Sequence, residues 1–456
     1  MIRARALVLI GLTLAPIAGA PNASARTSKP RIAPADSTRA TTPGIPASAW
    51  PDGTVRLKLE NLEGLMLLTA SIRGLRDRDT TGLLALDTGA GFLALDRELA
   101  RWAGIADSTE PPGGVGLSSH PLPRLSLGTL DLDQQSPVMT VDGEVIRAVT
   151  DRVVLGLLGQ MPLADRAVWI DPEHDVLALI PASPGPGAPY STDGRTAIQA
   201  SRDLLAGILS ARAAPLTFRI AGDGKILLSA EIGDRDTSVA GTKVTLILDS
   251  GATKSVLFQP TLGRRIPRFE NWKRMNGLTV PTLIGVSSAS MALIPSLTLI
   301  TQAGPLTVRD VDTALLASEL SAQLSTAVGE RVDGLLGASY LWRFRVAIDY
   351  PHRVLWLDPI PNWKNPRPFE YCHVGLQLER RDRALRVVGI VAGSPAELAG
   401  IRLGDDVTEI NGKPADDLQL IVANEMLEGR PGTEVSLSVR HDGEVTRRRL
   451  VRRRLL

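Results

Sequence analysis

Hydrophobic and polar residues alternate in short runs along most of the first 360 positions. Val55-Arg56-Leu57-Lys58-Leu59 is a clear example, and glycine, proline and aspartate separate the runs. A period of two is typical of a β-strand that buries one face. The runs continue to about Pro181, stop at a Pro/Gly-rich stretch, and resume from about Pro215 to Pro361. The pattern predicts a mainly β protein with two β-barrel lobes.

The two β regions repeat each other. A hydrophobic strand ending in Asp87-Thr88-Gly89-Ala90 is echoed by one ending in Asp249-Ser250-Gly251-Ala252. Further along, Gly-Leu-Leu-Gly at 156–159 is matched at 334–337, and the residues after each copy stay in register without a gap. An internal repeat of this length indicates that one structural unit has been duplicated.

The repeated aspartates are the strongest candidates for chemistry. Two carboxyl groups that face each other share a proton, so one can act as a general base and the other as a general acid. The hydroxyls of Thr88 and Ser250 could fix their orientation, while Gly89 and Gly251 allow a sharp turn. Asp-Thr-Gly is also ordinary turn chemistry, so the alternative is two β domains whose aspartates only stabilise a turn.

These motifs resemble the retropepsin-like aspartic proteases, and most closely their bacterial branch. The resemblance covers most of residues 51–360, and the second copy is the better match. It implies a pseudo-twofold arrangement in which Asp87 and Asp249 pair and activate a water, without metal, cofactor or covalent intermediate. The implied function is an aspartic endopeptidase, and the alternative is an inactive peptide-binding protein. Whether the lobes pair within one chain or between two chains stays open.

The sequence departs from the pepsin-like pattern at the flap. None of the four tyrosines, at positions 190, 340, 350 and 371, falls in the expected flap region. The candidates are glycine-rich segments instead, at 113–116 in the first copy and 277–285 in the second. Glycine-rich hairpin tips suit a lid that opens and closes.

A different module begins near residue 363. Gly393-Ser394-Pro395-Ala396-Glu397-Leu398, Leu403-Gly404-Asp405-Asp406-Val407 and Ile410-Asn411-Gly412 resemble a bacterial PDZ domain. The resemblance implies that C-terminal or unfolded peptide segments of protein substrates bind as an added strand. Residues 418–427 resemble the groove helix. The alternative is a PDZ domain that only packs, with a closed groove. The segment that resembles the carboxylate-binding loop is Val374-Gly375-Leu376-Gln377-Leu378.

Composition and charge limit the kinds of partner and ligand that we expect. The formal net charge is +2 and aromatic residues make up 4% of the chain, so no nucleic-acid partner is expected. The five histidines show no metal-ligand spacing, and His174 and His352 occupy the same place in the repeat, which favours a turn role. Cys372 is the sole cysteine, so no intrachain disulfide can form.

The N-terminal segment has the features of a signal peptide. Arg3 and Arg5 precede an apolar stretch at 6–17 that is followed by small residues. The alternative is an uncleaved anchor helix. We expect a periplasmic or secreted protein with no membrane contact beyond export. The expected segments are a signal peptide (1–25), a disordered linker (26–50), lobe 1 (51–182), a linker with a short helix (183–212), lobe 2 (213–362) and the PDZ domain (363–456).

Overall fold

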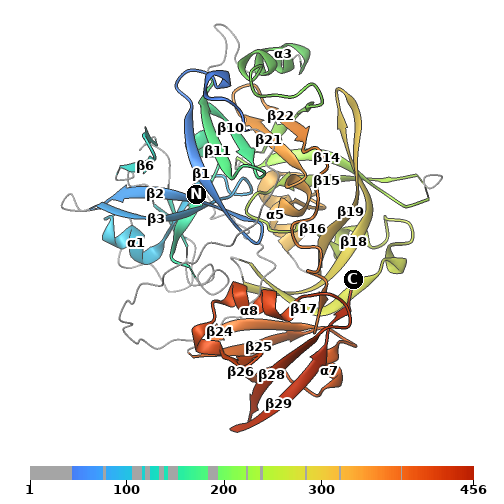
Figure 1. Ribbon diagram of the computed structural model, residues 1–456. Helices are drawn as coiled ribbons and strands as arrows, with labels where there is room; N and C mark the ends of the chain where they lie inside the picture. The colour runs from blue at the N-terminus through green and yellow to red at the C-terminus, as the bar shows by residue number, and fades with distance from the viewer. Residues whose placement is uncertain are drawn as a thin grey trace.

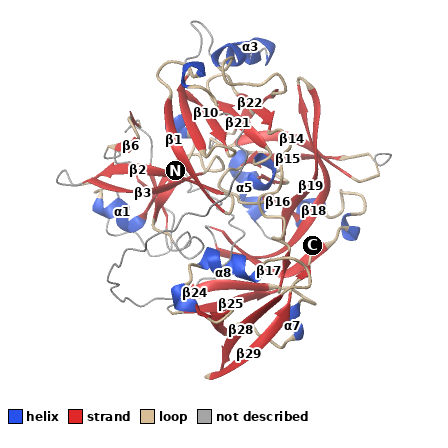
Figure 2. Ribbon diagram, in the orientation of Figure 1, coloured by secondary structure: helices blue, strands red, loops and turns tan. Residues whose placement is uncertain are grey.

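The computed structural model shows a mainly β protein, as the alternation predicts (Figures 1 and 2). The expected signal peptide and most of the linker after it lie outside the described residues. No helix among the described residues is long and apolar enough to cross a membrane. The structure describes residues 44–74, 79–104, 116–118, 124–132, 138–141, 152–182, 194–221, 224–236, 240–282, 285–317, 320–381 and 383–456.

The first β unit, called unit 1, is built around a strand that leads into Asp87. This strand, β3, runs parallel to β9, and β9 pairs on its other side with β4, which is antiparallel to it. Its elements are β1 (Val55–Leu62), β2 (Leu65–Arg73), β3 (Asp79–Leu86), β4 (Leu93–Asp96), α1 (Arg97–Trp102), β5 (Gly116–Ser118), β6 (Leu125–Leu127), β7 (Leu130–Asp131), β8 (Val138–Val141), β9 (Val154–Leu158), β10 (Arg166–Asp171) and β11 (Val176–Pro181).

The second β unit, called unit 2, repeats this arrangement. Here β15 runs parallel to β20, and β16 pairs antiparallel with β20. An additional pairing of β14 with β18 closes the sheet into a barrel. The elements are α3 (Gly194–Leu204), β12 (Ala214–Thr217), β13 (Arg219–Ile220), β14 (Ile226–Gly233), β15 (Thr242–Leu248), β16 (Ser255–Phe258), α4 (Gln259–Leu262), β17 (Arg274–Thr282), β18 (Gly285–Thr301), β19 (Gly304–Leu316), α5 (Leu320–Val328), β20 (Gly334–Leu336), α6 (Ala338–Leu341), β21 (Phe344–Asp349) and β22 (Val354–Pro359).

The first glycine of each Gly-Leu-Leu-Gly segment is required for the same structural reason in both units. A methyl group on Gly156 would lie 1.9 Å from the Ala94 carbonyl oxygen, and one on Gly334 would lie 2.0 Å from that of Val256. Neighbouring backbone therefore excludes any side chain at the first glycine of each segment. The glycines allow the close strand packing behind each aspartate.

A shared sheet joins the two units within one chain. Strand β10 pairs antiparallel with β21, and Trp169 lies opposite Ala347, its counterpart in the repeat. The sheet continues outward with β11 and β1 on one side and β22 and β12 on the other. Corresponding strands thus meet at the centre, which is the pairing that a pseudo-twofold axis requires.

The histidines of the repeat occupy matching turns in this sheet. The Nδ1 atom of His174 lies 2.7 Å from an Asp171 carboxylate oxygen, and that of His352 lies 2.8 Å from Asp349. Each aspartate also accepts the backbone N–H of its histidine. The hydrogen bonds fix the hairpin, and they confirm the turn role predicted for both histidines.

The C-terminal domain is a small sheet flanked by two helices. Its strand order places β24 at an edge of the described sheet, with α8 packed beside it. The elements are β23 (Cys372–His373), β24 (Leu376–Arg381), β25 (Ala384–Ile390), α7 (Pro395–Leu398), β26 (Asp406–Ile410), β27 (Lys413–Pro414), α8 (Leu420–Leu427), β28 (Glu434–His441), β29 (Glu444–Val451) and β30 (Arg453–Arg454).

Candidate functional site: a buried carboxyl pair and a domain junction

The two motif aspartates follow equivalent strands and lie together at the contact between the units. Asp87 comes directly after β3, and its N–H donates to the Leu158 carbonyl at 3.0 Å. Asp249 comes directly after β15 and donates to the Leu336 carbonyl at the same distance. Both side chains are buried, with exposed fractions of 0% and 1%. The repeat therefore brings both candidate residues into one place.

The hydroxyl residues lock the two loops together across the axis. The Thr88 N–H donates to Ser250 Oγ at 3.0 Å, and the Ser250 N–H donates to Thr88 Oγ1 at 2.9 Å. Each hydroxyl then donates to a carbonyl of the opposite strand, that of Leu248 or Leu86. This reciprocal set of bonds satisfies every group involved, so it holds the two aspartates in a fixed relation.

The motif glycines lie against the opposite aspartates. A methyl group on Gly89 would lie 2.6 Å from Asp249 Cγ, and one on Gly251 would lie 2.7 Å from Asp87 Cγ. The same glycine N–H groups each donate to the Oδ1 atom of the aspartate in their own loop, at 2.9 Å. The remaining Oδ2 atoms are buried and make no well-formed hydrogen bond within the described residues.

Gly89→Ala tests this close approach. The added methyl group would overlap the Asp249 carboxyl, so we expect a loss of about 1–3 kcal/mol in the free energy of unfolding. Gly194→Ala is the matched control, because its methyl group would meet only Thr217 Cγ2 at an ordinary 3.4 Å. Urea denaturation of both variants measures the difference. Equal stability of the two would contradict the placement of Gly89.

Burial raises the pKa of both carboxyl groups. Desolvation raises the pKa of Asp87 to about 6, while hydrogen bonds and the nearby Lys225 charge limit the increase. Desolvation and the neighbouring Asp87 charge raise the pKa of Asp249 well above its usual range. Because each group affects the other, the two titrate as a pair, and the pair holds a shared proton in weakly acidic solution.

Two residues beside the pair carry no motif and were not expected from the sequence. Lys225 is buried, with an exposed fraction of 4%, and the adjacent Gly224 packs against Gly91 of the first loop. The Gln160 amide, which follows β9, donates to the carbonyl of Thr88 in the first loop. Lys225 reaches the site through long-range packing, so no local sequence pattern predicts it, whereas Gln160 directly follows the first Gly-Leu-Leu-Gly segment.

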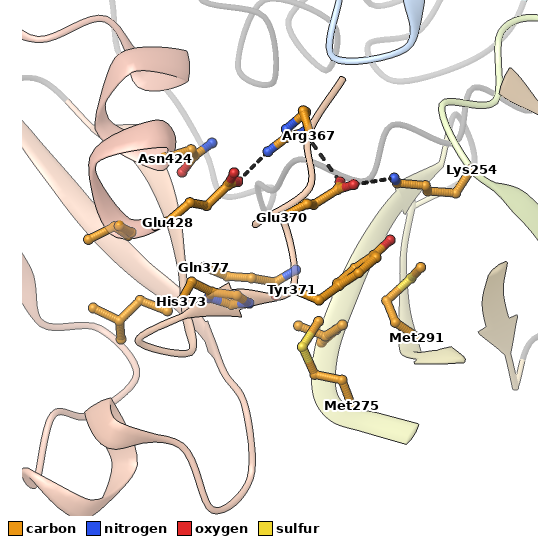
Figure 3. Close-up of a pocket in the computed structure, with 13 residues that line it drawn as sticks. Lys254, Met275, Met291, Arg367, Glu370, Tyr371, His373, Gln377, Asn424 and Glu428 are labelled. Carbon is orange, nitrogen blue, oxygen red and sulfur yellow. Dashed lines mark hydrogen bonds and ion pairs between the residues drawn. The ribbon is translucent and has the colours of Figure 1, made fainter. Parts of the chain in front are cut away.

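A second group of charged residues joins all three parts of the chain, and we call it the junction cluster. Lys254, five residues after Asp249, donates to Asp312 at 2.5 Å and to Glu370 at 2.8 Å. The Tyr371 hydroxyl donates to the same Asp312 carboxylate at 2.8 Å. Figure 3 shows Lys254, Glu370 and Tyr371 close together, with a dashed line between Lys254 and Glu370.

Arg367 extends the junction cluster to unit 1 and to α8. Its guanidinium lies 3.2 Å from Glu63 and 3.3 Å from Glu370, and it also pairs with Glu428. Burial, together with the neighbouring carboxylates, raises the pKa of Glu428 to about 7 despite this ion pair. Burial and the Arg367 charge lower the pKa of His373 to about 4. The imidazole is therefore neutral at pH 7.

One signal in the sequence could have pointed to this cluster. The two motif loops match closely, but Lys254 stands where the first copy has Phe92. The carbonyls of both residues lie against the second glycine of their Gly-Leu-Leu-Gly segments, at Gly337 and Gly159, so the positions are equivalent. A charged residue replacing a partly buried aromatic residue marks a contact that the first copy lacks.

The residues of the expected peptide-binding loop lie partly in the core of the C-terminal domain and partly against a pocket. Val374 and Leu378 belong to the domain core, and Gly375 takes a positive φ of 88°. The Gly375 N–H donates to His373 Nδ1 at 3.0 Å. Leu376 and Gln377 line a pocket between the C-terminal domain and unit 2 (Figure 3).

The lid predicted from glycine-rich segments takes a different form in the second copy. The segment at 277–285 contributes to the hairpin of β17 and β18, but β17 packs against β25 of the C-terminal domain. A methyl group on Gly277 would lie 2.2 Å from the Ile390 carbonyl oxygen, so this glycine serves the domain contact. In the first copy, residues 113–115 lie outside the described residues.

Comparisons with known proteins identify the C-terminal domain. Residues 373–449 match the family model of the PDZ domain. A carboxy-terminal processing protease from Bacillus subtilis, CtpA, is 34% identical over 70 residues, or 15% of either chain. Carboxyl-terminal-processing peptidase 3 of Arabidopsis thaliana is 32% identical over 95 residues, and a probable CtpA-like serine protease of Staphylococcus aureus is 32% identical over 75 residues. This chain spans about 15–18% of the length of these relatives.

Solved structures give only weak similarity. A photosystem II D1 C-terminal processing protease aligns with 18% of this chain and 23% of its own, at 24% identity and a TM-score of 0.18. An aspartic proteinase from Irpex lacteus aligns with 68% of this chain and 98% of its own, at 12% identity and a TM-score of 0.37. Neither value is high enough to assign a fold.

The expectation of an aspartic-type endopeptidase is contradicted by these names. The relatives are called carboxy-terminal processing peptidases and, in the staphylococcal case, a serine protease. The motif also has a structural role, which explains why it does not specify the reaction. In each loop the Asp carboxylate accepts the N–H of the motif glycine and so stabilises a turn. The aspartic-type classification is therefore wrong, and the comparisons support the PDZ domain at residues 373–449.

Proposed function

We propose that this chain binds peptide segments of protein substrates through its PDZ domain and takes part in their proteolytic processing. The observation that carries this proposal is the edge strand β24, which lies beside α8 and borders the pocket at the domain junction. PDZ domains bind an extended peptide as an added strand at such an edge. The names of the relatives, which are processing proteases, support the link to proteolysis.

We also propose roles for the residues expected from the sequence. Asp87 and Asp249 would be the acid–base groups of the chain, supported by their burial and raised pKa values. The loop from Val374 to Leu378 would hold the peptide end. The four neighbours that position the aspartates would be Thr88, Gly89, Ser250 and Gly251.

The finer fold assignment belongs to the same proposal. Units 1 and 2 would be duplicated copies of a retropepsin-like unit, spanning 51–182 and 213–362, with the PDZ domain at 363–456. Matching strand order behind each aspartate and the pairing of β10 with β21 support this origin. The positively charged, apolar N-terminal segment supports export to the periplasm or the medium.

Peptide binding by the full chain tests the proposed function. Fluorescence anisotropy would measure the affinity of the full chain for two labelled peptides with the same apolar last residue. One peptide ends in a free carboxylate, and the other ends in a C-terminal amide. We expect the free acid to bind at least about tenfold more tightly, because the loop N–H groups would hold the carboxylate. Mass spectrometry of the same mixtures should show shortened peptides. Equal affinity for both peptides, with no shortened product, would overturn the proposal.

A further inference from the structure

The PDZ domain and unit 2 are joined by a specific contact between strands. The Thr279 N–H of β17 donates to Gln377 Oε1 at 3.0 Å, and Gln377 Nε2 donates to the Thr279 carbonyl at 3.2 Å. Nearby, the Ala392 N–H donates to the Asn276 carbonyl at 3.2 Å. Gln377 is buried, with an exposed fraction of 5%. The outer face of β24 is therefore covered by unit 2.

The pocket beside β24 has walls from both parts of the chain. On the PDZ side it is lined by Leu376 of β24 and by Asn424 and Leu427 of α8. On the other side it is lined by Met275 and Leu278 of β17 and Met291 of β18. Figure 3 shows both methionines on the unit 2 side of this space, opposite the PDZ domain. The charged residues that line the pocket are already in ion pairs with one another, and they are Lys254, Arg367, Glu370 and Glu428.

Strand geometry decides which side chains of a bound peptide meet each wall. Successive residues of a β-strand point to opposite faces of the sheet. In a peptide added to the edge of β24, one side chain would point toward Leu376 and Leu427. The next would point to the face covered by unit 2, where Met275 and Met291 lie. Methionine side chains are flexible and adapt to apolar groups of different shape.

We propose that the PDZ domain and the methionine wall of unit 2 form one composite groove for an extended peptide with two consecutive apolar residues at its end. The PDZ pocket takes the last side chain, and Met275 and Met291 take the one before it. Unit 2 thus contributes to peptide selection, because it desolvates a side chain that a lone PDZ domain leaves in water. This composite groove rests on the proposed peptide binding, and it specifies which residues are preferred at the end of the peptide.

Two labelled peptides that differ only in the penultimate residue test the composite groove. Both end in leucine with a free carboxylate, and the residue before it is leucine or aspartate. We expect the full chain to bind the leucine peptide at least about tenfold more tightly, since burying one apolar side chain has this effect. In the double variant M275A/M291A the preference should fall to about threefold or less. Met161→Ala is the matched control, because Met161 is 42% exposed and lies in unit 1.

Hydrogen exchange gives a second readout that needs no variant. The dileucine peptide should slow amide exchange in β17 and β18 as well as in β24. Protection confined to the PDZ domain, or a preference that the double variant retains in full, would overturn the composite groove while leaving PDZ binding intact. Failure of the proposed function would give a different result. Each of the two peptides would then bind no more tightly than a version of it with a C-terminal amide.

Discussion

Asp87→Asn is expected to stabilise the folded protein at pH 8 by about 3 kcal/mol relative to the wild type. Burial raises the pKa of Asp87 to about 6 from an ordinary value of 3.8, so the folded state holds a proton that the unfolded state has lost. The wild-type free energy of unfolding therefore falls as pH rises from about 4 to above 6. Asparagine carries no charge and removes that loss. At pH 4 the two proteins should have nearly equal stability.

Urea denaturation at pH 4, 6 and 8 measures this effect. Asp52→Asn serves as the matched control, because Asp52 lies exposed in the turn before β1, and it should change the free energy of unfolding at pH 8 by less than about 0.5 kcal/mol. An Asp87→Asn variant that is less stable than the wild type at pH 8 would show that the carboxylate is needed to hold the two loops together. The raised pKa would then be the wrong physical picture.

Arg367→Ala is expected to destabilise the protein by about 3–5 kcal/mol at pH 8. The substitution leaves Glu63, Glu370 and Glu428 close together, mostly buried and without their shared cation. Breaking a buried ion pair by removing one partner has a cost of this size. The loss should be smaller at pH 5, because protonation of Glu428 relieves its repulsion with the other two carboxylates. Burial already raises the pKa of Glu428 to about 7.

Arg383→Ala is the matched control for the junction cluster. Arg383 is 88% exposed and pairs with Asp416 at the surface of the PDZ domain, so we expect a change below about 1 kcal/mol. Thermal unfolding of both variants at pH 5 and pH 8 compares the loss at the buried junction cluster with the loss at a surface ion pair. Similar small losses for Arg367→Ala and Arg383→Ala would mean that the junction cluster does not hold the domains together.

The repeat made much of the site predictable from the sequence. Asp87 and Asp249 stand at the same place in two matching segments, so the order of residues alone predicts that they pair across an axis. The hydroxyls of Thr88 and Ser250 follow from the same symmetry. The PDZ domain was also predictable, because its glycine, serine and proline positions form a long and specific pattern. These features are local or repeated, and such features can be recognised along the chain.

Apart from the Lys254 signal, the domain junction was not predictable for a physical reason. Arg367 meets Glu63 and Glu428 across long stretches of chain, and nothing near any of these residues marks the contact. Gln377 was expected to face a peptide, but its side chain binds the backbone of Thr279. The reaction class was predicted wrongly, because the motif fixes a turn and a carboxyl group but does not specify the chemistry.

The duplicated motifs place Asp87 and Asp249 in one coupled pair that holds a shared proton. Carboxyl ¹³C NMR of aspartate-labelled protein would follow this proton, with signals assigned through Asp87→Asn and Asp249→Asn. We predict that one step of the pair has its midpoint near pH 6, and that removing either group shifts the titration of the other. Two independent titrations near pH 4, each unaffected by substitution of the other residue, would contradict the coupled pair.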